Sequence, residues 1–487
     1  MTLEPIGYLV FMVGVIAFFR GSHLAITALC FMTLLGAAAA LQLPALGGGS
    51  IQPSHLMVLF LALTVLRRPN EIQASIRSLA PPAAGFWFAF YVLFSVASAI
   101  FLPRIFAGAT LVYSSARDSL GNISTIAMPL APGSSNITQA VYLLGGLACF
   151  AMISGFTLLG HAEFIARRLI ATAALCFLFA AIDASTFFIG YPEFLDFIRN
   201  ANYTMHTAET LGGFKRIVGS FPEASAYSSV ALVFFVFTLM LWLDKYPSRW
   251  VGPLSLLLGI SIIMSTSTTA YAASVVMFTL IVIVCLKQTI TGGTVGRHAP
   301  FLMVMLVGIP CLIMALMLLP DVWNAISGLV DIAVSDKMQS QSGEERTSWN
   351  RLSLISFLET STFGGGLGTV RASSFLFALL SNVGLIGTLL FTIFFYSMVK
   401  LYWKPSKTIS SQHRAIGMAA IMACISQVVS ATVSGSSTDL GLLFSIMAAL
   451  AIGCLSPAFA PVSRQLEMGV FYPFPNMSAK TPIGPVA

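Results

Sequence analysis

Long uninterrupted runs of apolar residues dominate the chain, and short polar segments separate them. Because each run approaches the length needed to cross a hydrocarbon core of about 30 Å, we predict thirteen membrane spans. The predicted spans cover residues 6–19, 24–43, 55–66, 83–103, 138–160, 169–190, 222–243, 250–264, 268–286, 299–319, 374–399, 415–433 and 439–458. The pattern predicts an all-α polytopic integral membrane protein with about 12–14 transmembrane helices, since the runs at 55–66 and 250–264 are short for full crossings.

Composition supports this class. The 487 residues are 57% hydrophobic and only 9% charged, whereas about a quarter of the residues in a soluble domain are charged. We expect residues 1–460 to form one membrane domain and residues 461–487, with several Pro, Ser and Lys residues, to form a disordered cytoplasmic tail. The seven cysteines fall within apolar runs without a CxxC pair, so we expect neither disulfides nor a metal site.

The distribution of basic residues predicts the orientation of the spans. Sixteen of the 25 Lys and Arg residues fall in one set of loops, which the positive-inside rule assigns to the cytoplasm. The opposite, outer loops then cover residues 104–137, 191–221 and 320–373. The first is rich in Ser, Gly, Asn and Pro and is expected to be a flexible covering loop. The net charge of +7 follows this topology and does not indicate a nucleic-acid partner.

The densest polar chemistry lies in the second outer loop, in the stretch KRIVGSFPEASAY at 215–227, just before a predicted span. Arg216 could bind a phosphate through paired hydrogen bonds, or could merely snorkel to the membrane interface. Glu223 could act as a general base, or could only begin the helix, where a negative charge is favourable. Further residues of this loop that could contact a ligand are Lys215, Tyr227, His206 and Tyr203.

The third outer loop supplies a second group of cations, Arg346, Arg351 and Arg371. Residues 348–360 show helical periodicity typical of a short helix lying in the membrane interface. A glycine run at 364–368 could let backbone N–H groups approach an anion. It matches no nucleotide-binding fingerprint, however, and a tight, closely packed turn is the favoured interpretation.

Three weaker signals remain. Asp183 lies near the outer end of an apolar run, and an intramembrane carboxylate is a functional candidate by default. The polar stretch at 265–271 could hydrogen-bond a sugar, but a helix cap is the favoured interpretation, and 434–439 is interpreted as a short outer turn with a cap.

In three of these stretches the chain resembles the O-antigen polymerase and O-antigen ligase superfamily of bacterial envelope glycan enzymes. The resemblance covers about residues 190–400 and rests on RIVGSFPEAS (216–225), STSTTAY (265–271), and Arg346-x4-Arg351 followed by FGGGLG (363–368) and SNVGLIG (381–387). It implies a GT-C-like fold in the bacterial inner membrane, with the active site facing the periplasm. It also implies that Arg216 and either Arg346 or Arg351 hold the diphosphate of an undecaprenyl-diphosphate-linked glycan, without a metal or cofactor.

The leading expectation is therefore a glycosyltransferase that polymerises undecaprenyl-diphosphate-linked repeat units, as donor and acceptor, into O-antigen or exopolysaccharide. Glu223, Arg216 and Arg351 are the catalytic candidates, and a chain-length regulator is a candidate partner beside the lipid bilayer. The ligases of this superfamily carry a functional histidine in the long loop, and 320–373 contains none, which favours a polymerase. A ligase-type transferase and a transporter of lipid-linked glycan or a small anion are the alternatives.

Overall fold

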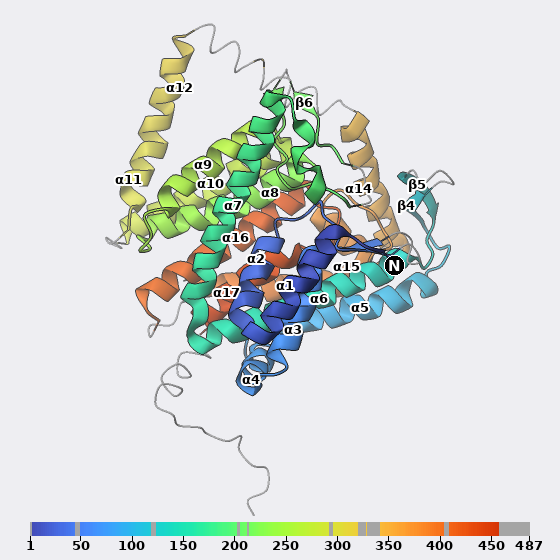
Figure 1. Cartoon of the computed structure of the whole chain (residues 1–487). Helices are drawn as coiled ribbons and strands as arrows, with labels where there is room; N and C mark the ends of the chain where they lie inside the picture. Colours follow the sequence, from blue (N-terminus) through green and yellow to red (C-terminus); the bar gives the residue numbers. More distant parts are fainter. Residues whose placement is uncertain are drawn as a thin grey trace, which may run out of the picture.

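The computed structural model describes residues 2–43, 49–117, 123–201, 205–211, 214–291, 296–319, 328, 341–403 and 409–456. The predicted tail at 461–487, Tyr203 and most of 320–340 lie outside these ranges. Within them the chain is a bundle of helices with three short sheets (Figure 1).

Seven helical segments in the described part of the chain are long and apolar enough to cross a membrane. They are α5 (Gly85–Ile105), the continuous segment Ser134–Ile189, α8 (Ala224–Leu243), α10 (Thr268–Ile290), the segment His298–Met317, α15 (Phe375–Trp403) and α16 (Ser411–Ser434). Five apolar helices are shorter: α1 (Pro5–Arg20), α2 (Ser22–Met32), α3 (Pro53–Val65), α9 (Val251–Met264) and α17 (Gly441–Leu455). The protein is a helical membrane protein, as predicted.

Each predicted span contains an α-helix, but several bounds differ from the prediction. The predicted spans 138–160 and 169–190 form one segment, composed of α6 (Ser134–Phe156), the π-helical turn η2 (Thr157–His161) and α7 (Ala162–Ile189). Within this segment Gly160 adopts a left-handed φ of 93°. The segment His298–Met317 likewise joins α11 (His298–Met303), the π-helical turn η4 (Val304–Gly308) and α12 (Ile309–Met317).

The predicted span 24–43 is wrong in its second half, because α2 ends at Met32. The chain then turns into β2 (Leu41–Leu43), which pairs on either side with β1 (Thr2–Leu3) and β3 (Gly49–Ile51). The prediction that 104–137 is a flexible covering loop also needs correction. Its described residues include an antiparallel hairpin of β4 (Leu111–Arg117) and β5 (Ile123–Pro129). In a hairpin the backbone N–H and C=O groups of the two strands hydrogen-bond to each other. Hydropathy does not reveal this pairing, so the hairpin was not predicted.

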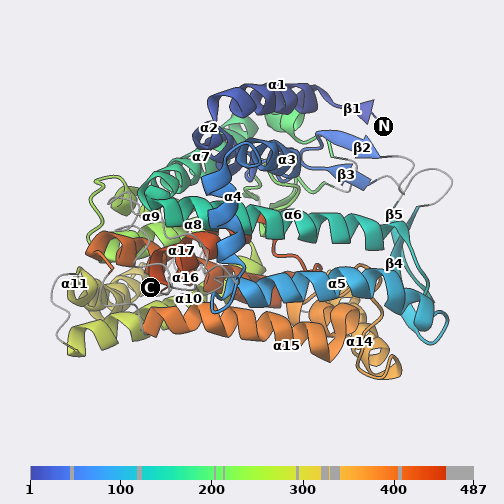
Figure 2. The same cartoon turned by 90° about the horizontal axis from the view of Figure 1, so that it is seen from below.

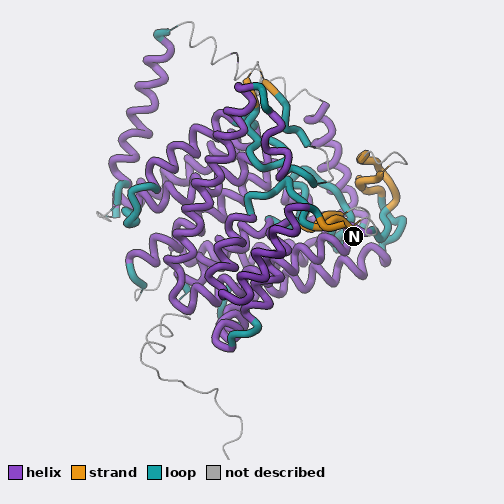
Figure 3. The backbone as a smooth tube through the Cα atoms, in the orientation of Figure 1, coloured by secondary structure: helices purple, strands orange, loops and turns teal. Residues whose placement is uncertain are grey.

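The three sheets gather on one side of the bundle, together with α14 (Gln341–Glu359) (Figures 1 and 3). The third sheet pairs β6 (Thr210–Leu211) with β7 (Phe214–Lys215). We call this side the hairpin face, and it carries the sheets and α14, which belong to the described parts of the three predicted outer loops. The amphipathic helix α4 (Pro69–Ser78) and the start of α11 lie on the other side, the opposite face (Figures 1 and 2).

Helix α8 is the centre of the core. In its most apolar window 78% of the residues are buried, against 12% for His298–Met317, which stands at the edge of the bundle (Figure 1). Helix α8 packs against α9 and α16, and α16 packs in turn against α17. A helix that is apolar on all sides is expected at such a buried place. The polar stretch 215–223 directly precedes this helix, so the core fixes where that stretch emerges.

The glycine run at 364–368 packs closely against α15. A Cβ on Gly364 would lie 2.7 Å from the Gly384 nitrogen, and one on Gly384, which has a φ of 65°, would overlap the Phe363 carbonyl. The N–H groups of Gly365 and Gly366 donate to the carbonyls of Ser381 and Asn382, at 2.7 and 2.9 Å. These donors are used inside the fold, so the run is a packed turn, as favoured from the sequence, and not an anion cradle.

Candidate functional site

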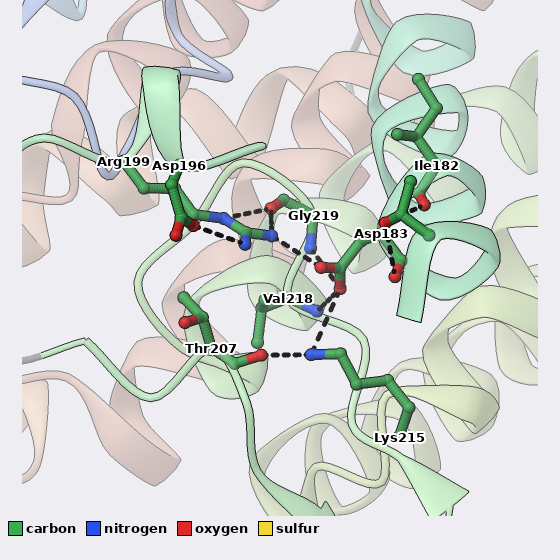
Figure 4. A network of polar contacts seen from close by, with 9 residues as sticks. Ile182, Asp183, Asp196, Arg199, Thr207, Lys215, Val218 and Gly219 are labelled. Carbon is green, nitrogen blue, oxygen red and sulfur yellow. Dashed lines mark hydrogen bonds and ion pairs between the residues drawn. The ribbon is translucent and has the colours of Figure 1, made fainter. Parts of the chain in front are cut away.

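A buried ion network anchors the second outer loop to α7 (Figure 4). Arg199 Nη2 lies 2.6 Å from Asp183 Oδ1, and both side chains are almost wholly buried. Asp183 Oδ2 accepts hydrogen bonds from the backbone N–H groups of Val218 and Gly219, at 2.9 and 3.2 Å. The guanidinium of Arg199 also donates to the Gly219 carbonyl, with Nε at 3.0 Å. Asp183 therefore acts here as the counter-ion that holds the loop, and Arg199 is a partner that the sequence reasoning missed.

Two residues predicted to bind substrate belong to this anchoring layer. Lys215 is buried, its Nζ lies 3.7 Å from Asp183 Oδ2, and it donates to the Thr207 carbonyl. Burial lowers the pKa of Lys215, and the Asp183 carboxylate opposes that shift. Tyr227 is fully buried in the first turns of α8, where its hydroxyl donates to Ser261 Oγ at 2.7 Å. Lys215 therefore holds the loop against α7, and Tyr227 joins α8 to α9.

Arg216 and His206 are brought together by Glu209. Arg216 Nη1 forms an ion pair with Glu209 Oε2, and His206 Nδ1 lies 2.9 Å from Glu209 Oε1. His206 is half exposed, while only 14% of the Arg216 side chain is accessible. Arg216 Nε is buried and has no hydrogen-bond partner among the residues that the structure describes. The guanidinium also interacts electrostatically with Tyr271, at the start of α10.

Glu223 occupies the N-cap position of α8, so its predicted place at the helix start is confirmed. Its side chain makes no capping hydrogen bond, however, and instead accepts one from Ser225. The half-buried carboxylate therefore keeps acceptor capacity beyond its structural contact.

Arg371, in the third outer loop, interacts electrostatically with Glu223. Burial lowers the pKa of Arg371, and the negative charge of Glu223 opposes that shift. The guanidinium carbon lies 4.6 Å from the centre of the Trp349 ring, a cation–π contact with α14. The backbone N–H of Arg371 donates to the Tyr113 carbonyl of β4 at 3.1 Å. The second and third outer loops therefore bring these opposite charges within electrostatic range of each other.

The other two arginines of the third loop lie on different faces of α14. Arg351 is exposed, together with Leu354 and Ile355. Arg346 is half-buried, on the face that carries Asn350, whose Oδ1 accepts the backbone N–H of Ser373 at 2.8 Å. α14 contains most of the helix predicted at 348–360. One face of α14 contacts the segment around Arg371, through Trp349 and Asn350. Arg351 lies on the exposed face of the helix, away from these contacts.

A polar pocket of about 320 Å³ opens beside Arg371 on the hairpin face. Its walls come from β4, the start of α6, the segment 368–371 and the turn between α16 and α17. Hydroxyl and amide groups dominate the lining, which includes Ser134, Ser135, Gln139, Thr369, Ser436, Ser437 and Thr438. Such groups hydrogen-bond sugars, and they surround a single guanidinium.

The turn between α16 and α17 has a defined structure at this pocket. Ser437 donates to Gln139 Oε1 at 3.1 Å and accepts the backbone N–H of Asp439 at 3.0 Å. Asp439 in turn accepts the Gly441 N–H at 2.8 Å, and burial raises its pKa. The sequence reasoning treated 434–439 only as a helix cap, and its density of hydroxyls is the signal that could have identified the pocket wall.

No protein-family model matches the chain, and no curated protein sequence matches it significantly.

Proposed function

We propose that the protein is a membrane glycosyltransferase that polymerises undecaprenyl-diphosphate-linked repeat units on its hairpin face, the periplasmic face by the predicted orientation. The observation that supports this best is Arg371, which lines a pocket rich in hydroxyl groups and interacts electrostatically with Glu223 of a different loop. Those are the groups that glycosyl transfer from a diphosphate needs: a cation for the leaving group, a carboxylate for the attacking hydroxyl, and a sugar-binding surface.

The leaving diphosphate is assigned to Arg371 and Arg216. As the bond between the anomeric carbon and the diphosphate oxygen breaks, negative charge grows on that oxygen, and a fixed cation in a site with little water stabilises it. Arg371 is held in place by Trp349 on one side and by the backbone of β4 on the other. Arg216 is the second cation. It forms an ion pair with Glu209, and the diphosphate would partly replace Glu209 as its partner. Arg346 is a further candidate of the clamp.

The acceptor is assigned to the pocket beside Arg371, with Glu223 as the base. The acceptor hydroxyl oxygen attacks the anomeric carbon, its proton passes to the Glu223 carboxylate, and undecaprenyl diphosphate leaves with the electron pair. Ser135, Gln139 and Ser437 would orient the acceptor sugar. Chain growth requires both a lipid-linked donor and a lipid-linked acceptor at this face, and a chain-length regulator remains a candidate partner.

The test is polymerisation by the purified protein in lipid nanodiscs supplied with lipid-linked repeat units from its own host. Wild-type protein should release undecaprenyl diphosphate and lengthen the glycan. Arg371→Gln should slow this by about 10²–10³-fold, as for loss of a transition-state donor, and Glu223→Gln by about 10²–10⁴-fold. Arg249→Gln, an exposed arginine before α9, is the matched control and should keep the wild-type rate.

Two outcomes would contradict this assignment. Full activity of Arg371→Gln or Glu223→Gln would remove that residue from the mechanism. Movement of intact lipid-linked units across a vesicle membrane, without release of undecaprenyl diphosphate, would identify a transporter.

A further inference from the structure

A second pocket lies on the opposite face, where four helix ends meet. Its volume is about 260 Å³, and its polar walls are Asp244 at the end of α8, Gln288 in α10, His298 in α11, and Ser411 and Arg414 in α16. None of these residues takes part in the site on the hairpin face, so the pocket requires an explanation of its own.

Two buried polar atoms of this pocket have no hydrogen-bond partner within the described residues: Asp244 Oδ2 and His298 Nδ1. His298 is 94% buried, and its Nε2 lies 3.4 Å from Asp244 Oδ1. Burial raises the pKa of Asp244 to about 6, and the Arg414 guanidinium opposes that shift. A buried carboxylate oxygen without a donor is costly, and a ligand that donates a hydrogen bond would remove the cost.

The pocket lies beside cation–aromatic pairs of the kind found at a membrane–water interface. Two residues before Asp244, the Trp242 ring lies 5.0 Å from the Arg297 guanidinium carbon. The ammonium of Lys287, next to Gln288, lies 3.8 Å from the centre of the Trp403 ring. Amphipathic aromatic rings at this position indicate the level of the phospholipid headgroups.

We propose that this pocket binds a phosphodiester that carries a primary ammonium, the headgroup chemistry of phosphatidylethanolamine. Arg414 supplies the cation for the phosphate, together with the Ser411 hydroxyl in the first turn of α16, where backbone N–H groups favour an anion. Asp244 accepts the N–H groups of the ammonium through its unpartnered oxygen. Because one pocket presents both a carboxylate and a guanidinium, a zwitterion satisfies both, whereas a simple anion leaves Asp244 unpaired.

The test is native mass spectrometry of the full-length protein in detergent with four probes. Phosphatidylethanolamine should remain bound, while phosphatidylcholine, whose quaternary ammonium has no N–H, and phosphatidylglycerol, which has no amine, should each bind about tenfold more weakly. Soluble phosphoethanolamine, the fourth probe, separates the two sources of this chemistry. Its displacement of the lipid at equal concentration would identify a soluble ligand, and its failure to do so a lipid.

Variants locate the binding. Asp244→Asn keeps the side-chain shape and removes the charge, and Arg414→Gln removes the charge and keeps a polar side chain; each should weaken phosphatidylethanolamine binding by about tenfold. Glu163→Gln, at a half-exposed residue paired with Arg167, and Arg249→Gln, at an exposed residue before α9, are matched controls and should bind as the wild type does. Wild-type affinity in Asp244→Asn, or equal binding of phosphatidylglycerol, would overturn the ammonium site. Wild-type affinity in Arg414→Gln would overturn the phosphate site.

Discussion

The buried pair of Asp183 and Arg199 yields the sharpest prediction about how the hairpin face is held together. Asp183→Asn keeps the side-chain size but removes the negative charge that Arg199 and the N–H groups of Val218 and Gly219 all share. Removing one member of a buried ion pair typically costs about 3–5 kcal/mol, because the remaining charge stays buried without compensation. The cost should fall on the docking of the loop, since the loop carries Arg199 while α7 carries Asp183.

Hydrogen–deuterium exchange of the purified protein measures this cost directly. A loss of about 3 kcal/mol corresponds to an increase on the order of 100-fold in loop opening, so the Val218 and Gly219 amides should exchange faster by that factor. Asp196→Asn is the matched control. Asp196 is 54% exposed and 3.5 Å from the same guanidinium, and a pair of this kind contributes at most about 1 kcal/mol. Equal exchange rates in the two variants would refute the reasoning.

Three further predictions concern packing and charge elsewhere. Gly384→Ala should lower stability by about 2–5 kcal/mol in thermal unfolding, because its φ of 65° is strained for alanine and the new Cβ overlaps the Phe363 carbonyl. Asn382→Leu should cost about 2–4 kcal/mol by the same measurement, because Asn382 Oδ1 accepts the backbone N–H groups of Thr369 and Val370, directly after the glycine run, each at 3.0 Å. Asp244 should destabilise the lipid-free protein as pH rises from 4 to 6, because its folded pKa of about 6 exceeds the usual 3.8 and its ionised form is therefore disfavoured in the fold. The melting temperature of Asp244→Asn should accordingly exceed that of the wild type above pH 6 and match it near pH 4.

Hydropathy was sufficient to predict the class and the approximate place of the apolar helices, because the cost of exposing backbone groups in lipid forces apolar segments to be helical. It did not predict the polar helix α4. Hydropathy failed where only part of an apolar run is helical. Residues 33–43 are apolar enough to suggest a continued span, yet β2 pairs there with β1 and β3. Strand pairing depends on partners that are distant in sequence, and these partners were not evident in the pattern.

Charge provided the candidate residues of the site but not their partners. Arg216, Glu223 and Arg371 could be selected because ionised groups are scarce in this chain. Their partners could not be predicted, since Arg371 comes within electrostatic range of Glu223 only after α14 and β4 have placed the third loop. Lys215 was indistinguishable from Arg216 in the sequence, and the structure separates them: one is buried on Asp183 and the other is paired with Glu209.

The pairing of charges on the hairpin face has a consequence for the proposed reaction. Arg371 interacts with Glu223 and Arg216 with Glu209, so both cations of the proposed clamp already have acidic partners. A diphosphate carries more negative charge than a single carboxylate and would draw these guanidinium groups away from their acids. Donor binding would then leave the Glu223 carboxylate without its cation and free to accept the proton of the acceptor hydroxyl. In this scheme the base becomes available only when a donor occupies the site, which couples the two substrates without any movement of the helices.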